Sequence, residues 1–281
     1  MHNIIDAHVH FWDIKNNINS WIKNFSSLPN LFLPEDLMRK YQSRPQGFIH
    51  IEAHDTHISS LMEQRWLSTI LGKDKDLLYK TVAFADITQE PNTFEKKIIN
   101  LKNYQYCMGI RHILSYHAVN KYSPNTIDLS LHKNITNNLV LLSKYNMILH
   151  IQCYPKQLAN LLPKIHKSQV KCVMDHAGLP ESLNETGLIT WNNIMTEASL
   201  NKNIYIKLSS LHYQYNQEYL YSIVLPCVDI FRSDRCMYGS NTPVAFIESP
   251  EIWKNQILSL NLTSEQNENI FYLTAKKLYK L

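Results

Sequence analysis

The strongest constraint on the fold of this chain is a repeated alternation of short apolar runs and longer stretches with helical spacing. The apolar, β-branched runs typical of strands are Ile4–His10, Gly47–Ala53, Tyr79–Asp86, Cys107–Ile113, Met147–Gln152, Val170–His176, Ile204–Ser209 and Arg235–Ser240. The segments with helical spacing are Pro34–Gln42, His57–Gly72, Thr93–Lys102, Ser130–Tyr145, Pro155–His166, Trp191–Leu200, Gln217–Phe231 and Pro250–Leu260. A last helix is predicted over Ser264–Tyr279, with Thr263 or Ser264 as its N-cap. Eight strands alternating with eight helices predict a (β/α)8 TIM barrel of the α/β class.

The structural alternative is a doubly wound open sheet, which normally carries a Gly-rich phosphate loop after its first strand. Here the first strand ends in His-Val-His-Phe-Trp instead. No internal repeat or Pro/Gly/Ser-rich linker divides the chain, so we expect one barrel domain over residues 1–281. Barrel sites are built by the loops at the carboxyl ends of the strands, which makes the long segments Asp13–Leu33 and Tyr116–Leu129 candidate lids or pocket walls.

Charge and cysteine content narrow the classes of partner and compartment. The formal net charge is only +4 and the basic residues are scattered, so no nucleic-acid or membrane-binding patch is indicated. The five cysteines form no close pair, which favours reduced core thiols over disulfides. The N-terminus lacks signal-peptide features, and no apolar run approaches the ~18–20 residues that span a bilayer. We expect a cytoplasmic monomer or homodimer that acts on a small molecule.

Two histidines at the end of the first predicted strand are the main candidates for a metal site. Side chains alternate along a strand, so Asp6, His8 and His10 are expected to point the same way, into the barrel. Imidazoles at i and i+2 on one strand end can bind one divalent ion. A single His-x-His pair is a weak motif that is often incidental, but its place at the end of the first barrel strand favours a function.

The sixth predicted strand ends in Asp175 and His176, followed by a Gly-Leu-Pro turn. His176 could be a third metal ligand or could polarise a substrate carbonyl, and a buried histidine beside a turn is the structural alternative. Asp175 has the opposite parity and is expected to face the helices, where it could cap one of them.

The eighth predicted strand leads into Asn241, in Gly-Ser-Asn-Thr-Pro. A hydrolase needs a group there that takes a proton from the attacking water, and an amide cannot do so. Asn241 could orient a carbonyl or a water molecule by hydrogen bonds. Alternatively it could simply serve the turn, for which Asn is a common residue.

Glu52 ends the second strand and Arg111 and His112 end the fourth. A carboxylate in an apolar strand is costly to bury unless it is paired, so Glu52 is a candidate metal ligand, base or partner of a basic residue. Arg111 is suited to hold a substrate carboxylate or lactone oxygen, and an internal ion pair with Glu52 is the alternative. His112 is a further candidate for substrate binding.

Four more residues are candidates for the pocket. His150 and Gln152 end the fifth strand with the same parity, and His150 is a candidate base. Lys207 ends the seventh strand and could supply a positive charge or serve a structural role. Trp12 is a candidate pocket wall. The chain has no Gly-x-Ser-x-Gly elbow and no Walker loop.

Taken together, the strand-end motifs resemble those of the amidohydrolase-2 branch of the amidohydrolase superfamily. The likeness is greatest to its lactonase group, which includes L-fuconolactonase and 2-pyrone-4,6-dicarboxylate lactonase. It covers nearly the whole chain, through Ile-Ile-Asp-Ala-His-Val-His-Phe-Trp-Asp at the start, Pro-Glu-Asp-Leu at 34–37, His-Ile-Glu-Ala at 50–53, Gly-Ile-Arg-His at 109–112, Gln-Cys-Tyr-Pro-Lys-Gln-Leu at 152–158, Asp-His-Ala-Gly-Leu-Pro at 175–180, Lys-Leu-Ser-Ser-Leu at 207–211 and Met-Tyr-Gly-Ser-Asn-Thr-Pro-Val at 237–244.

This resemblance implies an amidohydrolase-type barrel that opens a lactone ring with water. His8 and His10 match the first-strand pair, His176 the sixth-strand histidine and Arg111 a substrate-binding position. Some members of the group use one divalent metal, of which zinc is the leading candidate here, and some use none. The pattern usually has Gly-Ser-Asp-x-Pro at strand eight, where Asp is the presumed base and where this chain has Asn241.

Three hypotheses follow. The first is a hydrolase of a sugar-acid or dicarboxylate lactone, with a metal or the histidine cluster polarising the carbonyl and with Glu52, His150 or a metal-bound hydroxide as base. The second is a metal-dependent decarboxylase or C–C hydrolase on the same barrel. The third is a ligand-binding barrel that lost its base at Asn241.

Overall fold

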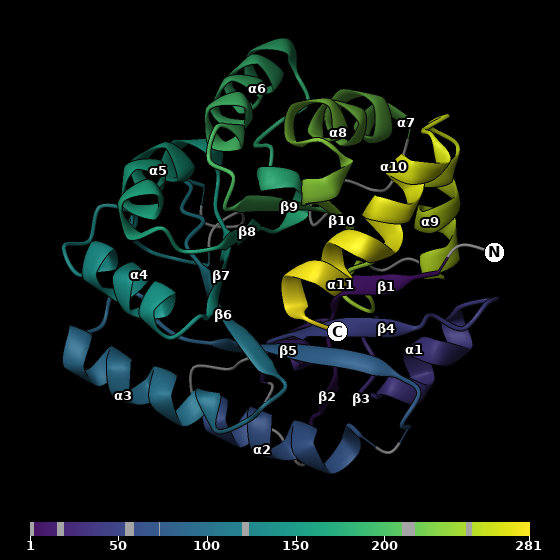
Figure 1. Cartoon of the computed structure of the whole chain (residues 1–281), viewed down its shortest axis with the longest axis horizontal. Helices are drawn as coiled ribbons and strands as arrows, with labels where there is room; N and C mark the ends of the chain where they lie inside the picture. Colours follow the sequence, from purple (N-terminus) through teal and green to yellow (C-terminus); the bar gives the residue numbers. More distant parts are fainter. Residues whose placement is uncertain are drawn as a thin grey trace.

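The computed structural model describes residues 3–15, 20–53, 59–72, 74–119, 124–209, 217–245 and 249–281. Its main sheet holds eight parallel strands in the order β1 (Ile5–Val9), β4 (Gly47–Ile51), β5 (Leu78–Phe84), β6 (Cys107–Ile113), β7 (Ile148–Gln152), β8 (Cys172–Met174), β9 (Ile204–Leu208) and β10 (Cys236–Tyr238). Helices surround the strands (Figure 1). The predicted (β/α)8 barrel is confirmed.

The barrel closes between β1 and the segment after β10. Asn241 N–H donates to the carbonyl of His8 over 2.8 Å, and His10 N–H donates to the carbonyl of Thr242 over 3.0 Å. Val9 and Thr242 form a parallel β-bridge. These backbone bonds bring the carboxyl ends of the first and last strands of the barrel together.

The helices of the outer layer lie where helical segments were predicted, although one of them begins at Glu185 and not at Trp191. They are α1 (Pro34–Lys40), α2 (Ser60–Ile70), α3 (Pro91–Lys102), α4 (Ile135–Lys144), α5 (Pro155–Ser168), α6 (Glu185–Ser199), α7 (Gln217–Tyr219), α8 (Leu225–Phe231), α9 (Pro250–Leu258), α10 (Ser264–Glu268) and α11 (Thr274–Tyr279). Two π-helical turns, η4 (Leu220–Val224) and η6 (Asn269–Leu273), join α7 to α8 and α10 to α11. Thr263 is the N-cap of α10, because its hydroxyl accepts from Gln266 N–H and the Gln266 side chain accepts from Thr263 N–H. The predicted start of α2 at His57 lies outside the described residues.

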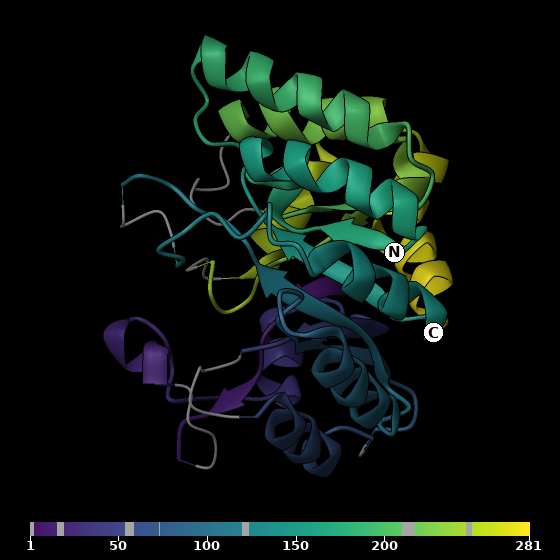
Figure 2. The ribbon, with the colours of Figure 1, turned by 90° about the vertical axis from the view of Figure 1, so that its left-hand side faces the viewer.

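A smaller antiparallel pair, β2 (Trp12–Asp13) and β3 (Leu31–Phe32), follows β1, and the 3-10 helix η1 (Ser20–Asn24) lies between its strands. Figure 2 shows this pair and the connection after β6 on one side of the barrel, with both termini on the other. That side corresponds to the carboxyl ends of the strands. Residues 16–19 and 120–123 of the two candidate lid segments lie outside the described residues.

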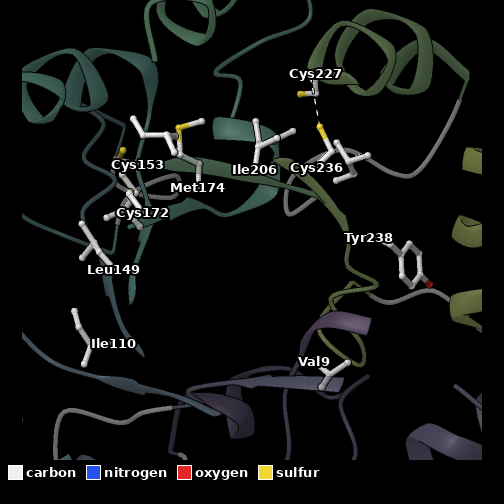
Figure 3. Packing of buried hydrophobic residues seen from close by; sticks show 14 of the residues in the cluster. Val9, Ile110, Leu149, Cys153, Cys172, Met174, Ile206, Cys227, Cys236 and Tyr238 are labelled. Carbon is white, nitrogen blue, oxygen red and sulfur yellow. Dashed lines mark hydrogen bonds between the residues drawn. The ribbon is translucent and has the colours of Figure 1, made fainter. Parts of the chain in front are cut away.

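Strand side chains pack in two layers. One layer faces the helices, as Figure 3 shows for Met174, Ile206 and Cys236. The thiol of Cys236 faces the carbonyl of Cys227 on α8. The other fills the barrel and packs against the last helix; it comprises Ile5, Ala7, Ile49, Ile51, Val82, Ile148, Val173 and Met237 with Tyr272, Ala275, Leu278 and Tyr279. The C-terminal helix α11 therefore closes the amino-terminal end of the barrel and leaves the carboxyl end for polar side chains.

All five cysteines are buried and free, as the sequence predicts. In the part of the chain that the structure describes, no helix is both long enough and apolar enough to cross a bilayer.

The prediction that Asp6 points into the barrel with His8 and His10 is wrong. The register of β1 against β4 shifts between Asp6 and Val9, so Ile5 and Ala7 fill the barrel while Asp6 faces the helical layer. Its carboxylate accepts from Tyr41 OH at 2.7 Å, from Ser240 N–H at 2.9 Å and from His8 N–H at 3.2 Å. Burial raises the pKa of Asp6, and these bonds oppose the rise. Asp6 thus ties β1 to the segment after β10 and to α1.

Tyr41→Phe removes one of the donors to this buried carboxylate and is expected to lower the free energy of unfolding by about 1.5–3 kcal/mol, measured by urea denaturation. The matched control is Tyr145→Phe, whose hydroxyl donates to Glu95 near the surface. Its expected cost is about 0.5 kcal/mol or less. Equal costs for the two variants would show that Asp6 does not hold the closure of the barrel.

Candidate active site

Polar side chains from several strand ends meet at the carboxyl mouth of the barrel. The structure brings together most of the predicted site residues with one another and with two that were not predicted as site residues. The set is His8, His10, Glu52, Arg111, His150, Gln152, Asp175, His176, Lys207, Ser209 and Asn241. Each of them is less than a tenth exposed.

Asp175 is the central anion of this set, so the expectation that it faces the helices is wrong. Its carboxylate lies 2.8 Å from Arg111 Nε, 3.1 Å from Lys207 Nζ and 3.4 Å from His8 Nδ1. Strand β8 is only three residues long, and its middle residue Val173 points into the barrel, which places Asp175 inward as well. Burial alone would raise the pKa of Asp175, but Lys207, His8 and Arg111 outweigh it and hold that pKa well below its ordinary value.

Arg111 makes the predicted internal ion pair with Glu52, with Nη1 donating to the carboxylate over 3.1 Å. Its Nε–H donates to Asp175, and Nη2 donates to the side-chain oxygen of Gln152 over 2.5 Å. Three of the five N–H donors of a guanidinium are thereby used, which leaves two for a ligand. The ion-pair and ligand-binding readings of Arg111 are therefore compatible.

Lys207 lies fully buried at the centre of the barrel. Besides Asp175 it contacts two imidazoles, with Nζ 3.2 Å from His150 Nδ1 and 3.3 Å from His8 Nδ1. Burial lowers the pKa of Lys207 to about 8, against the opposing effect of Asp175, so the ammonium form predominates at neutral pH. Lys207 is thus a buried cation of the site.

His150 lies below the mouth of the barrel. Its Nδ1 faces Lys207, and its Nε2 lies 3.2 Å from the hydroxyl of Tyr279 on α11. Burial, followed by Lys207, lowers the pKa of His150 to about 4. Because both ring nitrogens are engaged with protein groups, His150 supports the site from below and is not placed to accept a proton from a substrate water.

Three imidazoles line the mouth itself. The ring centroid of His8 lies 5.0 Å from that of His10 and 4.7 Å from that of His176. Burial is the main cause that lowers the pKa of His10 to about 3 and the pKa values of His8 and His176 well below their ordinary value. All three rings are therefore neutral at physiological pH.

Each of these rings is held through Nδ1. In His10, Nδ1 lies 2.9 Å from the carbonyl of Ile51, which can only accept, so Nδ1 carries the proton and Nε2 is an acceptor. In His176, Nδ1 lies 3.0 Å from Ser209 Oγ. The Nε2 of His8 is buried and has no hydrogen-bond partner among the described residues. Of these atoms, the Nε2 of His8 is the one available to a ligand, because His10 Nε2 faces the side chain of Asn241.

His176 reaches the site through an unusual turn. His176, Ala177, Gly178 and Leu179 all have positive φ angles, between 45° and 69°. Left-handed backbone costs a non-Gly residue about 1 kcal/mol or more, so the surroundings must hold this turn. Trp191 on α6 does so by donating from its indole to the carbonyl of Ala177 over 2.7 Å. The turn redirects His176, which strand alternation alone would point outward.

Asn241 serves the turn after β10, as the structural alternative predicted, and its side chain contacts His10. Its φ of 55° places it in the left-handed region that Asn tolerates, within the turn after β10. Its side-chain oxygen Oδ1 lies 3.2 Å from His10 Nε2. Because that nitrogen is an acceptor, a hydrogen bond forms when the amide is turned over so that its N–H2 group takes the place of Oδ1.

Two predicted site residues lie apart from the cluster. His112 packs edge-on to Phe84, and its Nδ1 faces the backbone N–H of Ile87 and the carboxylate of Asp86. Trp12 donates to the carbonyl of Pro29 and packs on Phe32 in the small β2–β3 unit. Neither has a contact with the histidines among those the structure describes.

Comparison with known proteins agrees with the family that the strand-end motifs resemble. The sequence model of a family described as Amidohydrolase matches residues 5–281. This chain belongs to the amidohydrolase family. A Burkholderia multivorans amidohydrolase solved with bound zinc superposes on this family member with a TM-score of 0.77 at 19% identity, covering 99% of both chains.

Two further relatives span the whole chain. A Pseudomonas putida structure assigned as a 2-pyrone-4,6-dicarboxylic acid hydrolase has a TM-score of 0.72 at 14% identity, covering 100% of this chain and 98% of its own. Uncharacterized protein y4mH of Sinorhizobium fredii (strain NBRC 101917 / NGR234) is 20% identical over 297 residues, covering 99% of this chain and 98% of its own length. At these identities the solved structures establish the fold of this amidohydrolase, which agrees with the barrel described above.

Because a relative in this fold contains zinc, the residues here can be tested as a metal site. The free Nε2 of His8 has the chemistry of a ligand. However, no group of three His, Cys, Asp or Glu side chains in the described ranges is placed to hold an ion. The ammonium of Lys207 lies on the other nitrogen of His8, and Asn241 brings no negative charge. As arranged, these residues do not fit a divalent ion.

Asn241→Asp is expected to supply the carboxylate that the site lacks, because carboxylate oxygen and imidazole nitrogen are both zinc ligands. Zinc affinity, measured by titration calorimetry, is expected to rise at least about tenfold over the wild type. Asn192→Asp, on the exposed face of α6, adds the same charge far from the site and serves as control. Wild-type protein that keeps one zinc per chain through exhaustive dialysis would contradict this account of the donor set.

Proposed function

We propose that this member of the amidohydrolase family hydrolyses the ring ester of a small lactone, derived from a sugar acid or a dicarboxylate. The observation that carries the proposal is the meeting of three neutral imidazoles, His8, His10 and His176, above a buried network of cations. Carbonyl chemistry needs neutral groups that can accept or donate a proton at a polarised oxygen. The assigned activity of the Pseudomonas putida relative supports the same substrate class.

Substrate binding falls to groups around Arg111. The guanidinium has two N–H donors beyond those given to Glu52, Asp175 and Gln152. Charge-assisted hydrogen bonds from such donors fit a carboxylate or a ring-ester oxygen. Because three hydrogen bonds already fix the guanidinium of Arg111, little side-chain entropy is lost when it binds a substrate.

His176 is the proposed base. Asn241 cannot take a proton, Glu52 balances the charge of Arg111, and both nitrogens of His150 are engaged. The Nε2 of His10 faces Asn241, which leaves His176, whose ring is held at Nδ1 by Ser209 and whose pKa is lowered by burial, so that it is neutral at physiological pH. It accepts a proton from water as the water oxygen attacks the carbonyl carbon.

The rest of the reaction returns that proton. The bond between the carbonyl carbon and the ring oxygen breaks, and the ring oxygen leaves as an alkoxide that takes the proton from His176. The product is the open-chain hydroxy acid. In this proposal the Nε2 atom of His8, whose ring lies 4.7 Å from that of His176, contacts the carbonyl oxygen, and the amide of Asn241, held by His10, orients the water.

His176→Gln is expected to lower kcat on a responsive lactone by about 10²–10⁴, because it removes the base and keeps a similar volume. Turnover is measured by proton release over a panel of sugar-acid lactones and a pyrone dicarboxylate. His166→Gln, at an exposed position on α5, is the control and is expected to retain activity. If no lactone is turned over faster by the wild type than by a His8→Ala/His10→Ala double variant, the proposed function is wrong.

A further inference from the structure

A continuous chain of buried side chains links the last helix to the mouth of the barrel. The hydroxyl of Tyr279 lies 3.2 Å from His150 Nε2, His150 Nδ1 lies 3.2 Å from Lys207 Nζ, and Lys207 Nζ lies 3.3 Å from His8 Nδ1. All four side chains are fully buried. Helix α11, which carries Tyr279, packs on the side chains that fill the barrel, and Figure 2 shows the C-terminus on the side opposite the β2–β3 pair.

The donors and acceptors along this chain can be counted. An ammonium has three N–H donors and no acceptor. Lys207 has three partners within 3.3 Å: the Asp175 carboxylate, His150 Nδ1 and His8 Nδ1. Each imidazole must therefore accept at Nδ1, and each neutral ring then carries its proton on Nε2. For His150 this proton is donated to the oxygen of Tyr279.

The same count of donors and acceptors indicates which ring nitrogen of His8 carries the proton. With Nδ1 accepting from Lys207, the proton of His8 lies on Nε2, the atom that has no partner among the described residues. The opposite tautomer would need Nδ1–H to donate to Asp175, which lies at 3.4 Å. The two contacts of His8 Nδ1 are 3.3 and 3.4 Å long, so the choice between them depends on where the N–H bonds of Lys207 point, and Asp175 and His150 are the other two partners of those bonds.

We infer that Tyr279, His150 and Lys207 are positioning residues that fix His8 as the Nε2–H tautomer, so that it offers a hydrogen-bond donor, and not a metal-binding lone pair, to the carbonyl oxygen of a substrate. The tautomer is a property of the free protein, and only the identity of the acceptor rests on the proposed function. The C-terminal helix thereby acts on the chemistry at the opposite end of the barrel.

The direct test is the tautomer of His8, read from long-range ¹H–¹⁵N correlation spectra of ¹⁵N-histidine-labelled protein, with His8→Ala to assign the signal. The wild type is expected to be protonated at Nε2. Lys207→Met removes the donor and is expected to move the proton to Nδ1, toward Asp175. A wild-type His8 protonated at Nδ1 would overturn the inference, whether or not any lactone is turned over.

Tyr279→Phe keeps the ring in the core and removes the acceptor for His150, so it remains informative if Lys207→Met fails to fold. It is expected to shift the ring signals of His150 and to lower kcat about tenfold with little change in KM, as for other supporting contacts of site groups. Tyr272→Phe is the matched control, because the hydroxyl of Tyr272 pairs with Lys276 on the same C-terminal segment. If Tyr279→Phe changes neither the His150 signals nor kcat relative to this control, α11 does not position the site.

Discussion

The site depends on one buried carboxylate held between two buried cations. Asp175 lies within 3.1 Å of both Arg111 Nε and Lys207 Nζ, and none of the three side chains is more than 6% exposed. Removing one member of such a set leaves an uncompensated charge in the interior, at a cost of about 3–5 kcal/mol. Asp175 belongs to the segment after β8, Arg111 to β6 and Lys207 to β9, so the same contact fixes the strand ends relative to one another.

This charge balance bears on the choice between metal and imidazole chemistry. Glu52 and Asp175 neutralise Arg111 and Lys207, which leaves the three histidines of the mouth neutral. A divalent cation at the mouth would be repelled by the nearby ammonium of Lys207. It would also lack a carboxylate ligand at position 241, where this chain has Asn and not Asp. The histidines can instead divide donor and acceptor roles among themselves, because their Nδ1 atoms face different partners: a backbone carbonyl, a hydroxyl and an ammonium.

Periodicity predicted the barrel well, because parallel strands buried on both faces are near-continuous apolar runs, and β6 was predicted with its observed bounds of Cys107–Ile113. Strict alternation failed where the backbone departs from it. A register shift in β1 turned Asp6 outward, and the three-residue β8 placed Asp175 inward. Val173 is an apolar residue in the middle of that run, and a residue two positions later lies on the same side of a strand. Its position inside the barrel could therefore have indicated that Asp175 points inward as well. The sequence of the last helix does not indicate a role for Tyr279 at the site, because its contact with His150 joins residues 129 positions apart.

The central claim, that Asp175 compensates Lys207, is tested most directly by a double-mutant cycle of unfolding free energies with Asp175→Asn and Lys207→Met. In the wild-type background, Lys207→Met is expected to destabilise the protein, because it leaves Asp175 with one cation fewer. In the Asp175→Asn background the same change is expected to stabilise it, because it removes a buried ammonium that has lost its partner. Equal costs of Lys207→Met in the two backgrounds would contradict the account.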